Sequence, residues 1–446
     1  MNSNSMNRRT FIGRTLAAGL GGTLFGRPWA FGTAQEGPLR FSKATLGDFY
    51  NLCQRQLVKE YFPFWENGGH DADLGGFICY LYPDGRVQDP RKDIWYQGRG
   101  IWVYSHFYNT FTEFPDRHWL LTRARMAREF MVRYMHQGDG TWLTTVDRAG
   151  KATGSIAIDR SQNIYGALFA AVGLIALAKA MGREEDLEHA RLSLRKSVKR
   201  YDDPAYPGVT APGVEKRGLR SQGHTFMLLW VIPQLLELSP DPVLEAVLSK
   251  QLDILHSKFW NPEFGISNEI LDHDYSRLPS QAGFMVPGHS IEAQWMGILA
   301  ARRMGKVDME ATFRERMRRL IEISWDEEFG GTCDTAYYAV AGGGHPAGPV
   351  MDIKTMWAQT EVCIGTMLAY ELSGETWALD WFNKSWSYLQ KTMTTPHGVW
   401  RQAVDRQGND KQREGISPYR MGNFHQPRCL MYLMQSIRRQ MGWRRF

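Results

Sequence analysis

The sequence lacks the signatures of several large enzyme classes. It has no phosphate-binding loop, because Gly342-Gly343-Gly344 is not followed by the lysine and hydroxyl residue of that motif. It also has no Gly-x-Ser-x-Gly nucleophile elbow. Its five cysteines are an odd number, and no two of them are spaced like metal ligands. We therefore predict no metal site, and we expect the cysteines to be mostly buried thiols.

The chain also has only a small excess of charge of one sign. The formal net charge is +6. The first 34 residues contain no acidic residue and four arginines, Arg8, Arg9, Arg14 and Arg27, so the remainder of the chain carries a net charge of +2. This balance gives no support to nucleic-acid binding. Aromatic residues, by contrast, are plentiful, with 16 Trp, 18 Tyr and 22 Phe. Aromatic ring faces stack on sugars, although they are equally common in cores.

The first 34 residues read as a targeting segment. Residues 7–12 (NRRTFI) look like a twin-arginine export signal, residues 16–25 are weakly apolar and glycine-rich, and residues 32–34 offer a cleavage site of small residues. The apolar stretch is too short to span a bilayer. The alternative is a disordered arm that happens to contain an arginine pair. We expect a periplasmic or extracellular protein, with no membrane contact after cleavage and a single catalytic domain over residues 35–446.

Short turns that combine an acidic residue or a glycine with an aromatic residue recur about every 65 residues, which indicates a repeat architecture. The six turns lie at residues 73–77, 138–142, 201–208, 261–265, 326–331 and 396–400.

Helical apolar periodicity fills the intervals between these turns. Alternate segments carry one charged face, as outer helices do, and the others are apolar almost all round, as buried inner helices are. This pattern predicts an all-α fold, an (α/α)6 barrel of about six helical hairpins, with short β-hairpins or long loops on the face where the inner helices begin. The twelve predicted helices span residues 42–64, 98–112, 116–136, 161–181, 184–200, 220–238, 241–259, 288–304, 308–324, 353–372, 375–393 and 424–441.

Strong polar residues stand near the start of every predicted inner helix, and closure of the barrel would gather them around one cavity. Buried polar groups need partners, so a concerted site explains them better than chance. They are Gln97 and Arg99; Asp159, Gln162 and Asn163; Arg220, Gln222 and His224; His289 and Glu292; Lys354, Trp357, Gln359 and Glu361; and His425 and Arg428.

Two histidines are the best candidates for acid–base chemistry. His289 and Glu292 are three residues apart on one helix face, where the carboxylate can orient the imidazole. A capped helix start is the alternative, and a metal site would need a third ligand such as His224. His425 would supply a second acid or base, and Arg99 could neutralise an anionic oxygen. Lys354 could do the same. Trp65, Trp95, Trp295 and Trp357 are candidates for sugar stacking, and core packing is the alternative for each of them.

Four motifs resemble those of the N-acylglucosamine 2-epimerase and cellobiose 2-epimerase superfamily, in order between about residues 45 and 435. They are Trp95-x-Gln97-x-Arg99, Pro287-Gly288-His289-x-x-Glu292-x-x-Trp295, Lys354-x-x-Trp357-x-Gln359-x-Glu361 and Phe424-His425-x-Pro427-Arg428.

This resemblance implies the (α/α)6 barrel and a set of roles. His289 and His425 would be the two acid/base histidines, Glu292 the carboxylate that supports the first, and Arg99 an oxygen-binding arginine. His224 matches a ring-opening or oxygen-binding histidine of part of the superfamily. Where those members often have a glutamate three residues later, this chain has Met227, which weakens an assignment to the cellobiose 2-epimerase branch.

The resemblance implies a sugar 2-epimerase that moves the C2 proton of a small reducing sugar through an enediolate, without a cofactor. The sugar would be N-acylglucosamine-like or N-acylmannosamine-like, or a related mono- or disaccharide. Three alternatives stay open: an aldose–ketose isomerase on the same site; a glycoside hydrolase of this fold, using two of Glu292, Glu361, Asp159 and Asp334; and a sugar-binding protein. The oligomeric state also stays open, a homodimer among the options. The predicted substrate-binding residues are His224, Lys354, Trp357, Glu361, Gln359, Asn163 and Trp95.

Overall fold

Helices make up most of the chain in the computed structural model, which describes residues 43–153, 163–211, 213–337, 348–350, 352–411 and 420–443. The described residues pack as one unit. The predicted export signal and the domain boundary after residue 34 lie outside the described residues and stay predictions, as do Asp159 and Gln162. None of the helices in the described part is long and apolar enough to cross a bilayer.

Each of the twelve predicted helices is present in the described part of the chain. The inner helices are α3 (Ile94–Thr110), α6 (Tyr165–Met181), α8 (Gln222–Leu236), α10 (Pro287–Arg303), α12 (Met356–Ser373) and α14 (His425–Gln440). The outer helices are α1 (Lys43–Arg55), α4 (His118–Met135), α7 (Glu184–Asp202), α9 (Pro242–Ile254), α11 (Val307–Ser324) and α13 (Thr376–Thr392). Short helical turns prolong two of them: η1 (Gln56–Tyr61), α2 (Phe62–Phe64) and η2 (Trp65–Gly69) follow α1, and η3 (Leu255–Phe259) follows α9.

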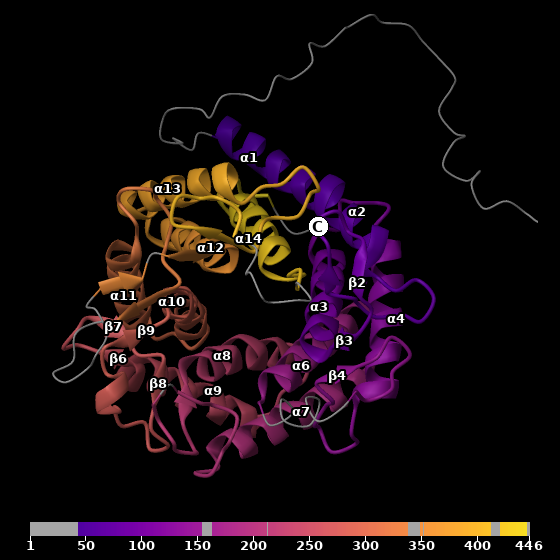
Figure 1. Ribbon diagram of the computed structural model, residues 1–446, viewed down its shortest axis with the longest axis horizontal. Coiled ribbons are helices and arrows are strands. Elements are labelled where there is room, and N and C mark those ends of the chain that lie inside the picture. Colours follow the sequence, from indigo (N-terminus) through magenta and orange to yellow (C-terminus); the bar gives the residue numbers. More distant parts are fainter. Residues whose placement is uncertain are drawn as a thin grey trace, which may run out of the picture. The chain divides into compact units, whose positions relative to one another are not determined.

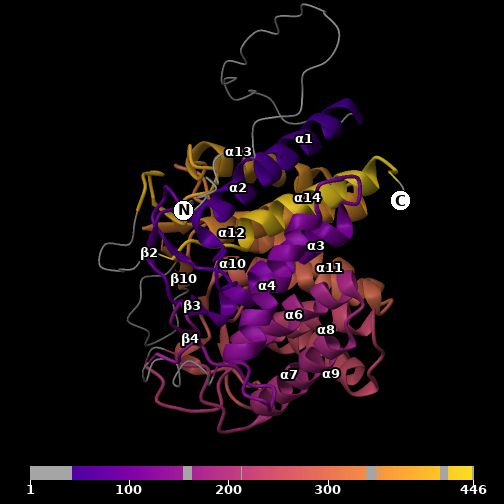
Figure 2. The ribbon, with the colours of Figure 1, turned by 90° about the vertical axis from the view of Figure 1, so that its right-hand side faces the viewer.

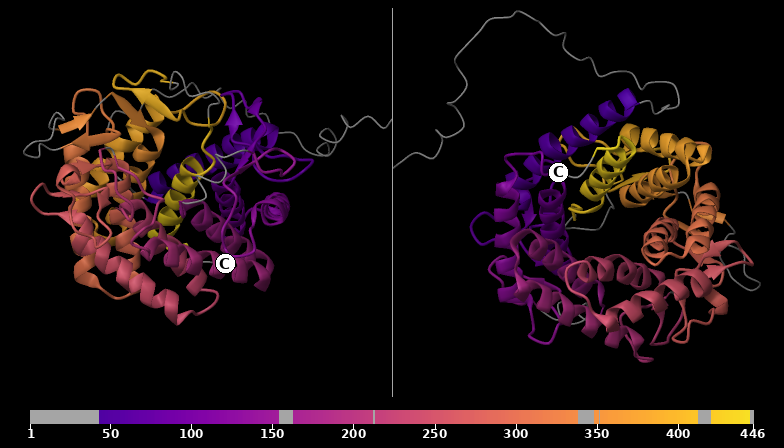
Figure 3. Two further views of the ribbon diagram at one scale, coloured as in Figure 1. Left: turned by 60° about the horizontal axis from the view of Figure 1, so that its bottom comes forward. Right: turned by 180° about the vertical axis from the view of Figure 1, so that it is seen from behind.

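The inner helices form a closed ring in chain order, with the outer helices around it (Figure 1). The right-hand view of Figure 3 shows the same ring from behind. The ring is tight where α3 meets α6, since a Cβ on Gly98 would lie 2.2 Å from the carbonyl oxygen of Phe169 and a Cβ on Gly173 would lie 2.6 Å from that of Gly98. Glycine on both sides is therefore what lets these two backbones touch. The prediction of an (α/α)6 barrel is confirmed.

Short antiparallel strands join the long loops at one end of the barrel. The pairs are β1 (Tyr80–Leu81) with β2 (Val87–Asp89), β3 (Lys92–Asp93) with β4 (Thr145–Val146), β5 (Arg220–Ser221) with β8 (Ile270–Leu271), β6 (Trp260–Asn261) with β7 (Ile266–Ser267), and β12 (Ile353–Thr355) with β13 (Ala403–Asp405); β10 (Thr335–Tyr337) lies between β9 (Phe284–Met285) and β11 (Gly348–Val350).

Four of these pairs have a common design. β3, β5, β9 and β12 each lead directly into an inner helix, and each pairs with a strand from the following long loop: β4, β8, β10 and β13. Figure 2 shows β2, β3, β4 and β10 at the same end of the helices. The start of each of these inner helices is thus fixed to its neighbour in the ring. The five cysteines are free and buried, as predicted.

Candidate active site

A side chain near the start of each of five inner helices ties that helix to a loop. Gln97 of α3 accepts from the backbone N–H of Phe77 (2.7 Å) and donates to the carbonyl of the same residue (2.8 Å). Gln359 of α12 makes the same pair of bonds with Thr332, both 2.8 Å. On α14, Gln426 accepts from the N–H of Trp400 and donates to the carbonyl of Gly398, and on α8 and α10 Gln222 and Ser290 both bond to Ser267. We call Gln97, Gln222, Ser290, Gln359 and Gln426 the anchor residues.

Gln359, which was predicted to bind substrate, is one of these anchor residues. The side chain is fully buried, and both ends of its amide are hydrogen-bonded to the backbone. Buried amides that are fully satisfied in this way hold structure together.

Lys354, also predicted to bind substrate, is engaged by protein groups. Its ammonium is completely buried, where it pairs with the carboxylate of Asp326 (2.9 Å) and donates to the carbonyls of Gly330 and Arg406. The Arg406 guanidinium closes the cluster on Asp326 (2.9 Å). The ammonium of Lys354 is thus matched by Asp326 and two backbone carbonyls, and its contact with substrate stays a prediction.

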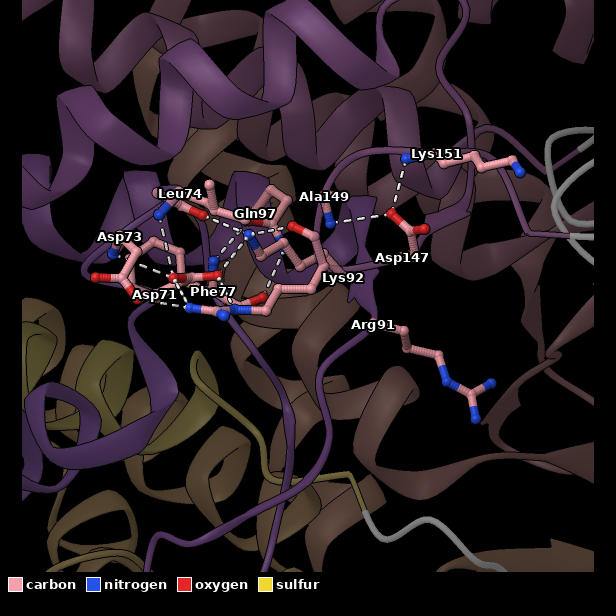
Figure 4. A network of polar contacts seen from close by, with 12 residues as sticks. Asp71, Asp73, Leu74, Phe77, Arg91, Lys92, Gln97, Asp147, Ala149 and Lys151 are labelled. Atoms are coloured by element: carbon pink, nitrogen blue, oxygen red, sulfur yellow. Dashed lines mark hydrogen bonds and ion pairs between the residues drawn. The ribbon is translucent and has the colours of Figure 1, made fainter.

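The first repeat contains the same clamp. Lys92 pairs with Asp71 (3.0 Å), donates to the carbonyls of Gly75 and Arg148, and Arg148 in turn bonds Asp71 (2.8 Å). Figure 4 shows Lys92 and Asp71 beside the anchor Gln97. Two buried lysine clamps thus hold the turns that lead into α3 and α12.

The residues two positions beyond the anchor residues form a cluster of polar side chains inside the barrel. They are Arg99, His224, Glu292, Glu361 and Arg428. Because each residue of an α-helix turns the chain by about 100°, a side chain two positions on faces away from the anchored loop, toward the barrel interior. The residue just before the anchor lies three positions from this one and shares its face. On α10 and α14 that residue is His289 and His425.

His289 is held by a carboxylate that the sequence reasoning missed. Its Nδ1 is 3.0 Å from Oε1 of Glu269, which lies between β7 and β8. Burial disfavours the imidazolium, but the charge and hydrogen bond of Glu269 outweigh it and raise the pKa of His289 to about 9. The His289 side chain remains 30% exposed, whereas that of Glu269 is 9% exposed. His289 is therefore a protonated, accessible acid at neutral pH.

His425 stands in the opposite electrostatic setting. Its Nδ1 is 3.0 Å from Oε1 of Glu361, and the Arg428 guanidinium donates to the same oxygen. Burial, followed by the cations of Arg428 and Arg99, holds the pKa of His425 well below its usual range. His425 is therefore neutral at physiological pH, and a proton on Nδ1 directed at Glu361 leaves Nε2 free as a base.

Glu292 does not hold His289 as the sequence suggested. The bond to His289 Nδ1 comes from Glu269, while Glu292 forms a buried ion pair with Arg428 (2.8 Å). Glu361, predicted to bind substrate, is fully buried and serves His425 and Arg428, with a further hydrogen bond from Trp295 (3.1 Å). Both glutamates thus contact other protein side chains, and these side chains in turn face the site.

Aromatic rings separate and flank the histidines. The ring of Trp357 lies 4.9 Å from that of His289 and 5.8 Å from that of His425. The Arg99 guanidinium lies over Phe169 (4.1 Å) and also faces Trp95 (5.3 Å). The buried Nε of Arg99 has no hydrogen-bond partner among the described residues. Such a cation is available to an oxygen of a ligand.

His224 and Asn163 lie together at the start of α8 and α6. The Nε2 of His224 is 3.2 Å from Oδ1 of Asn163, whose amide donates to the carbonyl of Gly208. His224 is fully buried, and burial lowers its pKa to about 3. Its Nδ1 is buried without a hydrogen-bond partner among the described residues. A neutral His224 could therefore accept or donate one further bond.

Glu269 was missed because it lies in a loop, outside any helical periodicity. Its one sequence signal is an acid beside the short apolar strands at residues 266–271. Arg428 was noted at a helix start without a role. Five of the motif positions lie together in the structure. Glu292 and Glu361 pair with Arg428, Glu361 also bonds to His425, and the Trp357 ring lies beside both His289 and His425.

A helical barrel in which two histidines are each paired with a carboxylate is an arrangement suited to acid–base chemistry. The family model of N-acylglucosamine 2-epimerase (GlcNAc 2-epimerase) matches residues 75–419. Among curated proteins, N-acylglucosamine 2-epimerase of Mus musculus is 27% identical over 86% of this chain and 90% of its own. Cellobiose 2-epimerase of Eubacterium cellulosolvens is 24% identical over 73% and 82%.

Solved structures show the same fold. A sugar epimerase from a ruminal bacterium superposes with a TM-score of 0.72 at 19% identity, covering 86% of this chain and 98% of that one. The chain belongs to the N-acylglucosamine 2-epimerase family. It is a carbohydrate epimerase, an enzyme of the isomerase class.

Proposed function

We propose that this enzyme inverts C2 of a reducing sugar by using His425 as the base and His289 as the acid. The observation that carries the proposal is the opposite surroundings of the two histidines: Glu269 bonds to His289 and raises its pKa, whereas burial, together with the Arg428 guanidinium beside the ring, lowers the pKa of His425. An enzyme that removes a proton from one face of a carbon and returns another to the opposite face needs one neutral and one charged group.

The reaction starts from the open-chain aldehyde, because the C2 proton is acidic only beside a carbonyl. His425 Nε2 takes that proton, and an enediolate forms. Arg99 stabilises the charge on its oxygens, since a buried cation placed in advance costs no reorganisation. His289 then donates its proton to the other face of C2, which yields the 2-epimer. Donation to C1 would instead yield a ketose.

A glycoside hydrolase needs two carboxyl groups that face the substrate, one acid and one base or nucleophile. Glu292 and Glu361 are fully or almost fully buried, and both are paired with Arg428. Glu269 is engaged by His289. Of the other two candidates for hydrolysis, Asp334 accepts a hydrogen bond from Thr355 (3.3 Å), and Asp159 lies outside the described residues. The surroundings of Glu269, Glu292 and Glu361 therefore favour the histidines over these three carboxylates as the acid–base groups.

The substrate remains to be found among small reducing sugars, and proton NMR in D2O would identify it. We would incubate the purified protein with N-acetylglucosamine, mannose, glucose, cellobiose and mannobiose. The proposal predicts deuterium at C2 together with the 2-epimer of at least one sugar. A ketose product would make the enzyme an aldose–ketose isomerase. Unchanged sugar, or new reducing ends released from a glycoside, would contradict the proposal.

We also propose that the protein is exported by the twin-arginine route and that the mature enzyme works outside the cytoplasm. The Arg8-Arg9 pair and the glycine-rich stretch behind it support this. Replacement of both arginines by lysine should leave the protein in the cytoplasm, as followed by cell fractionation. A homodimer is a further proposal, which light scattering of the mature protein would test.

A further inference from the structure

The two histidine–carboxylate pairs differ in how the carboxylate is shared. Glu269 has one cationic partner among the described residues, His289, and its Oε2 is buried without a hydrogen bond. In Glu361, by contrast, Oε1 contacts both Nδ1 of His425 and a guanidinium nitrogen of Arg428, while Oε2 accepts a hydrogen bond from Trp295. The negative charge of Glu269 is thus available to an imidazolium, whereas that of Glu361 is already matched.

Arg428 lies between two carboxylates. Its side chain is fully buried, its Nη1 pairs with Glu292 (2.8 Å) and its Nη2 with Glu361. The same Nη2 lies 3.2 Å from Nδ1 of His425. The guanidinium also stacks over Phe424 (4.6 Å). An arginine stays charged at any physiological pH, so His425 always has a cation in contact with its ring.

The position of Arg428 has a counterpart of opposite charge. Arg428 stands three residues after His425 on α14, and Glu292 stands three residues after His289 on α10. The same helix position therefore presents a cation to one histidine and an anion to the other. Arg99 from α3, Glu361 from α12, and Glu292 and His289 from α10 complete the charged surroundings of His425.

We propose that Arg428 is a positioning residue that keeps His425 unprotonated, and therefore ready as a base, while His289 holds its proton. Arg428 acts by taking up the charge of Glu361 and by standing beside the imidazole as a like charge. Its use in the reaction rests on the proposed function, but its effect on His425 does not, because that effect exists in the free protein.

The test is the titration of the histidines followed by NMR of the full protein labelled with 13C at histidine Cε1, with His425→Asn to assign the resonance. In Arg428→Gln the pKa of His425 should rise by about 1–2 units, since Glu361 then stabilises the imidazolium alone. Arg428→Lys, which keeps the charge, should leave that pKa low. Trp295→Phe is the matched control, because it removes a neutral donor from Glu361 without changing charge, and its effect should be several-fold smaller.

Loss of Arg428 leaves two buried carboxylates, so Arg428→Gln could fail to fold. The double variant Arg428→Gln with Glu292→Gln removes one charge of each sign and should show a smaller rise, because Glu292 also favours the imidazolium of His425. A folded variant without Arg428 in which the pKa of His425 is unchanged would overturn the proposal. C2 deuterium exchange by the same variants separates the two claims. A raised pKa with no exchange by the unmodified enzyme supports the role of Arg428 and contradicts the proposed function.

Discussion

The starts of α3 and α12 are built on one pattern and end in opposite charges. Lys92, Trp95, Gln97 and Arg99 have the same spacing as Lys354, Trp357, Gln359 and Glu361. The lysines and glutamines make matching contacts in the two repeats. The last residues do not: Arg99 faces aromatic rings, and Glu361 serves His425 and Arg428.

This comparison shows that a repeated scaffold can carry different chemistry at one fixed position. The clamp and the anchor set where the side chain two residues beyond the anchor lies, and the identity of that side chain decides what it does. Changes to the shared part should therefore act alike in both repeats, whereas changes to the last residue should act differently.

The largest effect should come from breaking a clamp. Lys92→Met or Lys354→Met leaves a buried aspartate without its ammonium partner, and we expect each to lower the free energy of unfolding by about 3–5 kcal/mol. Denaturant titration would measure this. Lys250→Met, which removes an exposed ion pair with Asp202 (3.2 Å), is the matched control and should cost no more than about 1 kcal/mol. Equal losses in all three variants would contradict the account of the clamps.

Substitutions of Arg99 and Glu361, the charged residues that end the two patterns, should differ in their effects on the kinetics. Arg99→Gln should lower kcat by about 10²–10³-fold, because it removes stabilisation of the enediolate, and should move the acid limb of the pH profile to higher pH, because the cation of Arg99 helps to hold the pKa of His425 low. Glu361→Gln should lower activity and move the acid limb in the opposite direction, to lower pH, because it removes the carboxylate beside the His425 imidazole. Steady-state kinetics from pH 5 to 9 would separate the two. The same pH profile in both variants would remove the distinction between them.

The anchors should have smaller and similar effects. Gln97→Ala and Gln359→Ala each leave buried backbone groups of a turn unpaired, and we expect a loss of about 1–3 kcal/mol in the free energy of unfolding. Gln137→Ala, at a part-buried position with one long bond of 3.4 Å, is the comparison variant and should change stability little. A stable Gln97→Ala beside a destabilised Gln359→Ala would show that the two anchors are not equivalent.

Acid sensitivity should distinguish α3 from α12, since α3 contains His106 and α12 contains no histidine. Burial lowers the pKa of His106 to about 3, well below the unfolded value of about 6.5. The unfolded chain then binds a proton that the folded chain does not, so stability falls as pH drops below 6.5. The slope is about 1.4 kcal/mol per pH unit for this residue. His106→Gln should reduce the pH dependence of the unfolding free energy between pH 6.5 and 4.5 by that amount.

The fold could be predicted from the sequence because helical periodicity and the 65-residue recurrence of turns both report local structure. The site could be predicted only in part. The motifs identified His289 and His425, but they could not distinguish an anchor such as Gln359 from a residue that faces the barrel interior such as Glu361. That distinction depends on which side of the helix meets a loop. Glu269 could not be predicted at all, because its contact with His289 joins a loop to a helix 20 residues away.

The most direct test of the two-histidine account is C2 proton exchange in D2O by His289→Asn and His425→Asn, with each epimer of the substrate supplied separately. His289→Asn keeps the base on one face, so it should exchange the C2 proton of one epimer without inverting it. His425→Asn should exchange only the other epimer. If either variant exchanges both epimers, or still interconverts them, the reaction does not use one histidine on each face of C2.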